Sequence, residues 1–198
     1  ASNVATDVDI ALTPKGAGAL TAQVADNAVT GGNKRGIYAV DWQMNRNSAA
    51  HVASGNYSTI GGGRYNSAPG HESIVAGGNS NLTSGLQSFV GGGVANTASS
   101  TSGAVVGGLG NQASGNYGFV GGGRENNASG TISTISGGKQ NIASGDYSAI
   151  PGGVGLTLGT NADRTFGFNA NTLAEDRSMS VDAANTAVFN NVDFWLSN

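Results

Sequence analysis

The fold is decided by a sequence repeat, and an early copy of this repeat is SGNYSTIGGGRYNSA at residues 54–68. This stretch holds one Ile, two Tyr and one Ala among Gly, Ser and Asn, a composition that in isolation suits a flexible linker. A pair of glycines, however, returns every 15 residues, and such a fixed period is typical of repeat architectures. The seven pairs are Gly62-Gly63, Gly77-Gly78, Gly92-Gly93, Gly107-Gly108, Gly122-Gly123, Gly137-Gly138 and Gly152-Gly153.

Three further columns of residues keep the same period. A β-branched residue stands two places before each glycine pair: Ile60, Val75, Val90, Val105, Val120, Ile135 and Ile150. An asparagine follows three places after each of the first six pairs: Asn66, Asn81, Asn96, Asn111, Asn126 and Asn141. A small residue stands two places beyond each asparagine: Ala68, Thr83, Ala98, Ala113, Ala128 and Ala143.

A repeat of this length and composition excludes helices, because glycine is unfavourable there by about 1 kcal/mol per site and helical repeats are longer. It predicts two short strands per turn, one around YSTI and one around NSAS, with glycines at corners of positive φ. Successive turns then pair through backbone hydrogen bonds. The predicted fold class is all-β: a parallel β-roll or β-helix solenoid of 15-residue turns, with β-rich caps at both ends.

The alternation of side chains along a strand places Ser58 and Ile60 inside the coil and Thr59 outside. One β-branched, one small and one Ala side chain per turn make a thin core, so we expect copies to associate as an intertwined or side-by-side homotrimer. We expect the asparagines either to form a ladder or to occupy left-handed corners. The outward column that association would cover reads Thr59, Ile74, Phe89, Ala104, Phe119, Thr134 and Ala149.

Composition limits the classes of partner. The 198 residues contain 9 Lys and Arg against 12 Asp and Glu. The chain thus lacks the excess of basic residues that is typical of proteins that bind nucleic acid. The chain has no Cys, which excludes disulfides and thiolate metal sites. No apolar run approaches the roughly 20 residues that span a bilayer, so we expect no membrane insertion.

Three domains are expected. Residues 1–50 form an N-terminal β-rich cap or connector, residues 51–155 a seven-turn solenoid, and residues 156–198 a C-terminal β-rich trimerisation cap. Strand candidates in the last segment are RTFGFNAN, RSMSVDA and TAVFNNVDFWL. The aromatic residues Phe189, Phe194 and Trp195 are expected in the trimer core.

The repeat columns resemble the head repeats of trimeric autotransporter adhesins, with NYSTIGGG, NYGFVGGG and DYSAIPGG in place of the family's inner-strand motif. The order DVDIALTPKGAGAL, GGNKRGIYAVDWQ, glycine-rich repeats and RSMSVDAANTAVFNNVDFWL resembles the distal part of phage tail-fibre or tail-spike proteins. In those relatives the segment commonly precedes a self-cleaving intramolecular chaperone, which would begin after Asn198. Both resemblances imply an extended trimeric attachment device, on a virion or on a bacterial surface.

Sites for chemistry are sparse in the repeats. The GGGRYN segment lacks the lysine of a phosphate-binding loop, and periodic calcium binding needs an Asp in each turn where only Asp146 occurs. A glycan hydrolase needs two nearby carboxylates, but Glu72 and Glu125 lie more than three turns apart. His51 or His71 could hold an ion on a trimer axis. The outward column lacks the regular threonine row of an ice-binding solenoid.

The sequence therefore predicts a non-enzymatic, structural segment of a phage tail fibre that takes part in host attachment, with no cofactor and no metal. The alternatives are the head of a bacterial trimeric adhesin and a fibre-borne glycan hydrolase. Partners would be other fibre segments and a host-surface glycan or protein receptor. Aromatic rings with basic neighbours suit sugars or anionic polymers. The candidate contacts are Tyr57, Arg64, Tyr65, Tyr117, Arg124, Lys139 and Tyr147.

Overall fold

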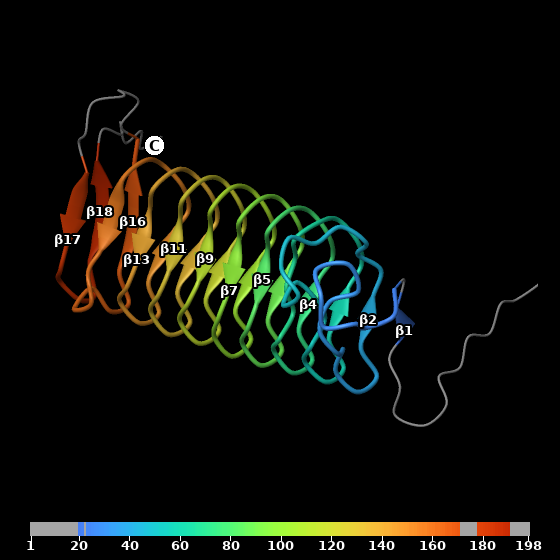
Figure 1. Cartoon of the computed structure of the whole chain (residues 1–198). Coiled ribbons are helices and arrows are strands. Elements are labelled where there is room, and N and C mark those ends of the chain that lie inside the picture. Colours follow the sequence, from blue (N-terminus) through green and yellow to red (C-terminus); the bar gives the residue numbers. More distant parts are fainter. Residues whose placement is uncertain (1–19, 22, 171–177, 191–198) are drawn as a thin grey trace, which may run out of the picture.

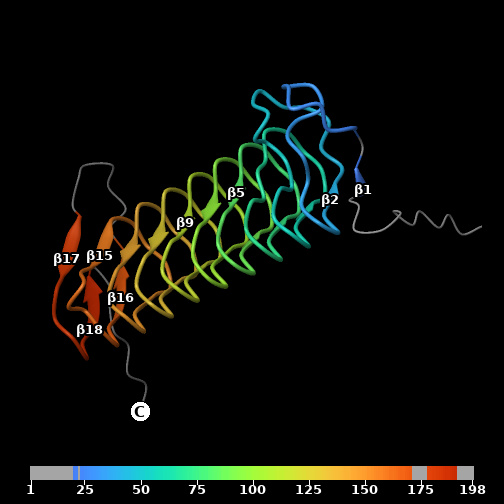
Figure 2. The ribbon, with the colours of Figure 1, turned by 60° about the horizontal axis from the view of Figure 1, so that its bottom comes forward.

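The computed structural model describes residues 20–21, 23–170 and 178–190 and shows an elongated coil of β-strands. Each turn lies against the next, from β1 and β2 at one end to β17 and β18 at the other (Figures 1 and 2). The described residues contain no helix, and so none that could cross a membrane. The predicted all-β parallel solenoid is therefore confirmed.

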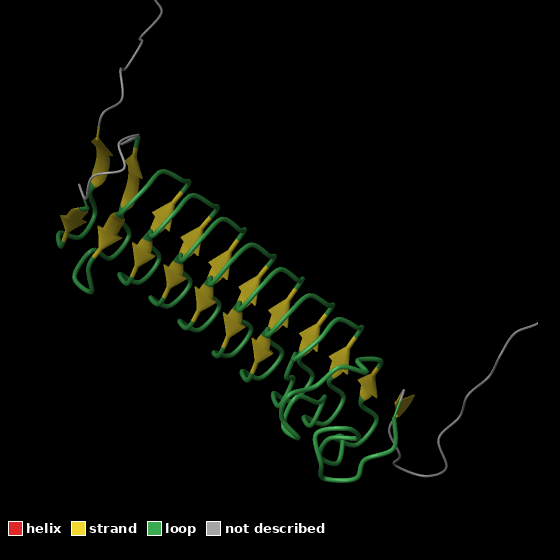
Figure 3. Cartoon of the chain, turned by 45° about the horizontal axis from the view of Figure 1, so that its top comes forward, coloured by secondary structure: helices red, strands yellow, loops and turns green. Residues whose placement is uncertain are grey.

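The strands form two parallel sheets on different sides of the coil, joined by loops (Figure 3). The long sheet has 11 strands: β1 (Leu20–Thr21), β2 (Val40–Asp41), β3 (Thr59–Ile60), β4 (Ile74–Val75), β6 (Phe89–Val90), β8 (Ala104–Val105), β10 (Phe119–Val120), β12 (Thr134–Ile135), β14 (Ala149–Ile150), β16 (Phe166–Asn169) and β18 (Ala187–Asn190). The short sheet has seven: β5 (Leu82–Thr83), β7 (Thr97–Ala98), β9 (Gln112–Ala113), β11 (Asn127–Ala128), β13 (Ile142–Ala143), β15 (Leu156–Leu158) and β17 (Met179–Val181).

Strands of adjacent turns pair in register at the sequence period, so that Thr59 faces Ile74 and Ile74 faces Phe89. The pairing continues on both sides of residues 51–155, but with wider spacing. The interval is 19 residues between Val40 and Thr59 and 17 between Ala149 and Phe166. The three strand candidates after Gly155 contain β16, β17 and β18, while Phe194 and Trp195 lie outside the described residues.

The core is a stack of small side chains that repeats from turn to turn. Ile60, Val75 and Val90 of the long sheet are fully buried. The small residues of the same turns, Ala68, Thr83 and Ala98, are fully buried as well. Ser58 is buried and Thr59 is partly exposed, as the alternation predicted. Each buried β-branched side chain contributes about 1.5–3 kcal/mol through its removal from water.

The asparagine column forms a hydrogen-bonded ladder inside the coil. The Asn81 Oδ1 accepts a hydrogen bond from the backbone N–H of Asn96 (3.0 Å), and its Nδ2 donates to the carbonyls of Gly77 (2.9 Å) and Gly93 (3.1 Å). The pattern repeats in every turn from Asn66 to Asn141. Buried polar groups are tolerated only when they are paired in this way.

The ladder has defined ends, and it decides between the two alternatives expected for the asparagines. At one end the Gln43 Oε1 accepts from the Asn66 N–H (2.7 Å), and at the other the Asn141 Oδ1 accepts from the Leu156 N–H (3.0 Å). Of the two alternatives expected for the asparagines, the structure shows the ladder, although the amides bond mainly to backbone groups and not to stacked amides, and it excludes left-handed corners. Positive φ falls one residue earlier, as at Tyr65 (59°), because the asparagine must point inward to reach its partners.

Close approach between turns explains the second glycine of each pair, but not the first, whose Cβ position is open in six of the seven pairs. It also acts on another column with the same period: Gly55, Gly70, Gly85, Gly115, Gly130 and Gly145. A Cβ on Gly93, whose φ is +81°, would lie 2.2 Å from the carbonyl oxygen of Gly108 in the next turn. A Cβ on Gly115, in the other column, would lie 2.1 Å from the carbonyl oxygen of Gly130. A Cβ at such distances would force the neighbouring turn to shift, which favours glycine at both positions. The column of Gly115 admits one exception, Ser100, whose Oγ donates to the Gly115 carbonyl.

Two adjacent asparagines allow a test of the ladder. Asn126→Ala would leave the buried N–H of Asn141 and the carbonyls of Gly122 and Gly138 without their side-chain partner. We expect the free energy of unfolding to fall by about 2–4 kcal/mol, since the Asn141 N–H and the Gly122 carbonyl lose a partner at roughly 1–3 kcal/mol each, while the Gly138 carbonyl keeps the N–H of Arg124. Asn127 points outward, so Asn127→Ala should cost less than about 1 kcal/mol. Urea denaturation measures both; equal losses would contradict the assigned role of the ladder.

Candidate functional site

The left-handed residue two places before each long-sheet strand from β2 to β18 defines a surface row that we call the first corner. Its φ angles lie between 52° and 59°, and its backbone is paired along the coil: the Tyr117 N–H donates to the Thr101 carbonyl (2.9 Å) and the Tyr147 N–H to the Thr131 carbonyl (2.8 Å). The candidate residues Tyr57, Tyr117 and Tyr147 all lie here and are exposed. The full row is Tyr38, Tyr57, Glu72, Gln87, Ser102, Tyr117, Ile132, Tyr147, Arg164 and Asn185.

At one end of the first corner the rings stack on one another. The centroids of Tyr38 and Tyr57 lie 5.3 Å apart with an interplanar angle of 29°, and those of Tyr57 and His71 lie 5.5 Å apart at 59°. Sequence reasoning missed Tyr38 because it precedes the strict repeat. The signal was present, since GIYAV at residues 36–40 matches GNYST at residues 55–59.

The other candidates lie on a second corner, just beyond the opposite end of the long-sheet strands. Arg64, Arg124 and Lys139 belong to a row of isolated parallel bridges in which Arg124 pairs with Lys139. The Arg64 guanidinium carbon lies 5.7 Å from the centroid of the Tyr65 ring. The left-handed residues of this corner are Tyr65, Ser80, Ala95, Gly110, Glu125, Gln140 and Gly155.

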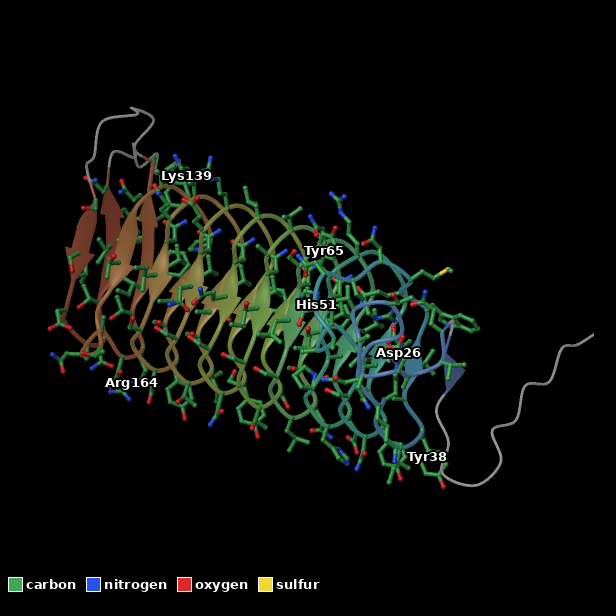
Figure 4. All side chains as sticks on the ribbon, viewed as in Figure 1. Asp26, Tyr38, His51, Tyr65, Lys139 and Arg164 are labelled. Carbon is green, nitrogen blue, oxygen red and sulfur yellow. The ribbon has the colours of Figure 1, made fainter. Side chains whose placement is uncertain are left out.

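The seven candidate residues therefore form two separate surfaces and not one site. Tyr65 and Lys139 mark the upper edge of the coil in Figure 4, whereas Tyr38 and Arg164 mark the lower edge. The first corner offers aromatic and aliphatic side chains. The second offers most of the basic ones, and the Arg124 Nη2 is already paired with the Glu125 Oε1 at 3.0 Å.

The outer faces of the two sheets differ in chemistry. Neither sheet carries a charge on the outward residues of its described strands, but those of the long sheet are mostly Val, Ile, Phe and Ala, whereas the short sheet presents mainly Ser, Thr, Asn and Gln. We call the first surface the apolar face; its members are Val40, Thr59, Ile74, Phe89, Ala104, Phe119, Thr134, Ala149, Phe166, Phe168, Ala187 and Phe189. The short-sheet members are Leu82, Thr97, Gln112, Asn127, Ile142, Thr157 and Ser180.

Glu72 and Glu125, the two carboxylates considered for a glycan hydrolase, do not lie on the same corner. Glu72 lies on the first corner, where its Oε2 accepts from the Gln87 Nε2 (2.8 Å). Glu125 lies on the second, where its Oε2 accepts from the Gln140 Nε2 (2.9 Å). Within the described ranges no group of three or more His, Asp and Glu residues is placed to hold a metal ion.

A buried charged cluster closes the coil near its N-terminal end. Asp41 pairs with Ile60 of the next turn and so continues the β-branched column, yet it is fully buried. Its Oδ2 accepts from the Arg35 Nε (2.9 Å) and the Arg46 Nη2 (3.1 Å). Arg46 also donates to the backbone carbonyl of His51 (2.9 Å). The ion pairs end the apolar column with groups that are hydrogen-bonded except for the buried Arg35 Nη2.

His51 beside this cluster predicts a pH dependence. Burial, and secondarily the positive charge of Arg46, lower the pKa of His51 below 6.5. As pH falls, the unfolded chain binds a proton near its ordinary pKa of about 6.5 before the folded chain does. Stability should therefore decline from about pH 6.5 downward until the folded pKa is passed. Thermal melts between pH 8 and pH 5 should show a smaller decline for His51→Gln; an identical decline would refute this cause.

Comparison with known proteins assigns no family to the chain. No protein-family model matches the chain, and no curated protein matches it at a significant level. The two corners and the apolar face are therefore the features from which a function has to be argued.

Proposed function

We propose that the chain is a structural, trimeric segment of a phage tail fibre, carried on the virion, that helps attach it to a glycan or protein on the host surface. The observation that carries the proposal is the apolar face. It runs the length of a stiff, repetitive coil, which suits lateral association into a rod. The resemblance of the flanking segments to tail fibres supplies the biological setting.

The apolar face has the chemistry of a surface that is covered by copies of itself. Phe89 and Phe119 are 37% and 38% exposed in the single chain, and Ile74 and Phe166 are similarly open. Large continuous apolar patches on a protein surface mark interaction sites. Strands about 4.8 Å apart make this face about 50 Å long, and its register lets equivalent residues of parallel copies meet turn by turn.

Three copies with their apolar faces turned to a common axis would bury this surface and leave both corners and the short sheet in solvent. The outward strand residues of both sheets are uncharged, but the described strands of the long sheet also present five phenylalanines, so burial of this face removes more apolar surface from water. Backbone hydrogen bonds between all turns resist bending along the axis. Such a rod can carry a receptor contact away from a virion without an enzymatic step.

Introducing charge into the apolar face tests the assembly. The double variant Phe89→Glu/Phe119→Glu would place carboxylates on the shared axis and should convert the trimer to a monomer. Gln112→Glu, on the outer side of the short sheet, is the matched control and should remain trimeric. Light scattering measures the solution mass, expected at three times the 19.5 kDa of one chain for the wild type and the control.

The outcomes separate assembly from attachment. A folded wild-type monomer would refute the trimeric fibre. A trimer that, when fluorescently labelled, binds none of a panel of intact bacteria would keep the rod and refute the attachment role.

A further inference from the structure

Three successive turns of the first corner carry large apolar side chains in solvent. Tyr117, Ile132 and Tyr147 are 58%, 44% and 57% exposed, and their φ angles are 58°, 56° and 58°. Backbone hydrogen bonds tie each turn to the next, from the Ile132 N–H to the Asn116 carbonyl and from the Tyr147 N–H to the Thr131 carbonyl (both 2.8 Å). We call these three residues the apolar strip.

The backbone does not require large side chains at these positions. Left-handed φ disfavours residues with bulky or β-branched side chains, and Ile132 is the most unfavourable case. The same corner is formed by Ser102 and Asn185, and the equally left-handed second corner by Ala95 and Gly110. The apolar strip thus retains side chains that neither the turn geometry nor the core explains, and such outliers indicate functional positions.

Each residue of the apolar strip directly follows a polar residue. The pairs are Asn116 with Tyr117, Thr131 with Ile132 and Asp146 with Tyr147. Among the described residues, the side chains of Asn116 and Thr131 make no hydrogen bond, and Asp146 uses one oxygen, which accepts from the Thr131 N–H (2.8 Å). Each turn therefore offers one apolar surface and one available polar group.

The ring stack farther along the first corner differs in both respects. One face of the Tyr38 ring is occupied by the Tyr57 ring, although both side chains stay about half exposed. The Asn56 Oδ1 already accepts from the Ile37 N–H (3.0 Å), and Glu72 is bonded to Gln87. The apolar strip is also short, spanning three turns between Ser102 and Arg164, whereas the apolar face runs the length of the coil. A surface of limited length with polar edges suits a small ligand better than a second copy.

We infer that the apolar strip binds a neutral glycan. A pyranose ring has an apolar C–H face, which stacks on aromatic side chains, and a rim of hydroxyls, which hydrogen-bond to amide, hydroxyl and carboxylate groups. The charged residues beside Tyr147 are Asp146, Asp163 and Arg164, and their net negative charge disfavours an anionic polymer. This inference rests on the proposed attachment function and names the class of receptor that the fibre would contact.

The test uses the full chain on a printed array of neutral and acidic oligosaccharides. The double variant Tyr117→Asn/Tyr147→Asn should lose binding by roughly tenfold per tyrosine removed. Asparagine is well tolerated at left-handed φ and already occupies this position at residue 185, so the melting temperature should stay constant or rise. Tyr117→Phe/Tyr147→Phe should retain binding within about threefold, because the ring faces remain. Gln87→Asn, on the same corner, is the matched control.

Several outcomes would overturn the inference. These are a wild type that binds no glycan, one that binds only acidic glycans, and a Tyr→Asn double variant that melts earlier while binding normally. Light scattering on the same samples separates the two proposals. A trimer without neutral-glycan binding refutes the apolar strip alone, whereas a monomer that binds neutral glycans keeps the strip and refutes the fibre assembly.

Discussion

The structure depends on the register between turns: each inward residue must meet its counterpart one turn later. The asparagine ladder enforces this constraint, because the Asn96 side chain bonds to Gly92 of its own turn, to Gly108 of the following turn and to the next asparagine's N–H. A shift by one residue would leave all of these buried groups unpaired at once. Polar hydrogen bonding thus supplies the specificity that a thin core of Val and Ala does not.

The same constraint separates structure from function along the chain. Positions that face the interior or approach the next turn closely are restricted to a few residue types, as at Val105, Gly108 and Asn111. Outward strand positions are not restricted by contacts with the next turn, whereas the corners are restricted only by their left-handed φ. Side chains therefore vary from turn to turn at both corners, as at Ser102, Tyr117 and Ile132.

The repeat predicts most of the fold, because period, strand positions and inward columns all follow from side-chain alternation and glycine geometry. The repeat could not predict how the ends of the coil are built. Asp41 continues the β-branched column as a buried charge, and only the folded loop brings Arg35 and Arg46 to it. The candidate contacts were chosen by residue type, so their separation onto two corners needed the structure. Tyr38 does not appear among the predicted contacts because it precedes the strict period, and Ile132 does not because it is neither aromatic nor basic.

Left-handed corners are where this architecture can display side chains without disturbing its core. In the first corner the backbone N–H is held by the preceding turn, so the conformation persists whatever side chain it carries. A large residue there loses some backbone stability but projects into solvent at a fixed spacing along the coil. The ladder provides the stability that allows this: because each turn is fixed by its neighbours, a strained position such as Ile132 does not unwind the coil. Rigidity of the interior and variability of the corners are thus two results of one repeated hydrogen-bond pattern.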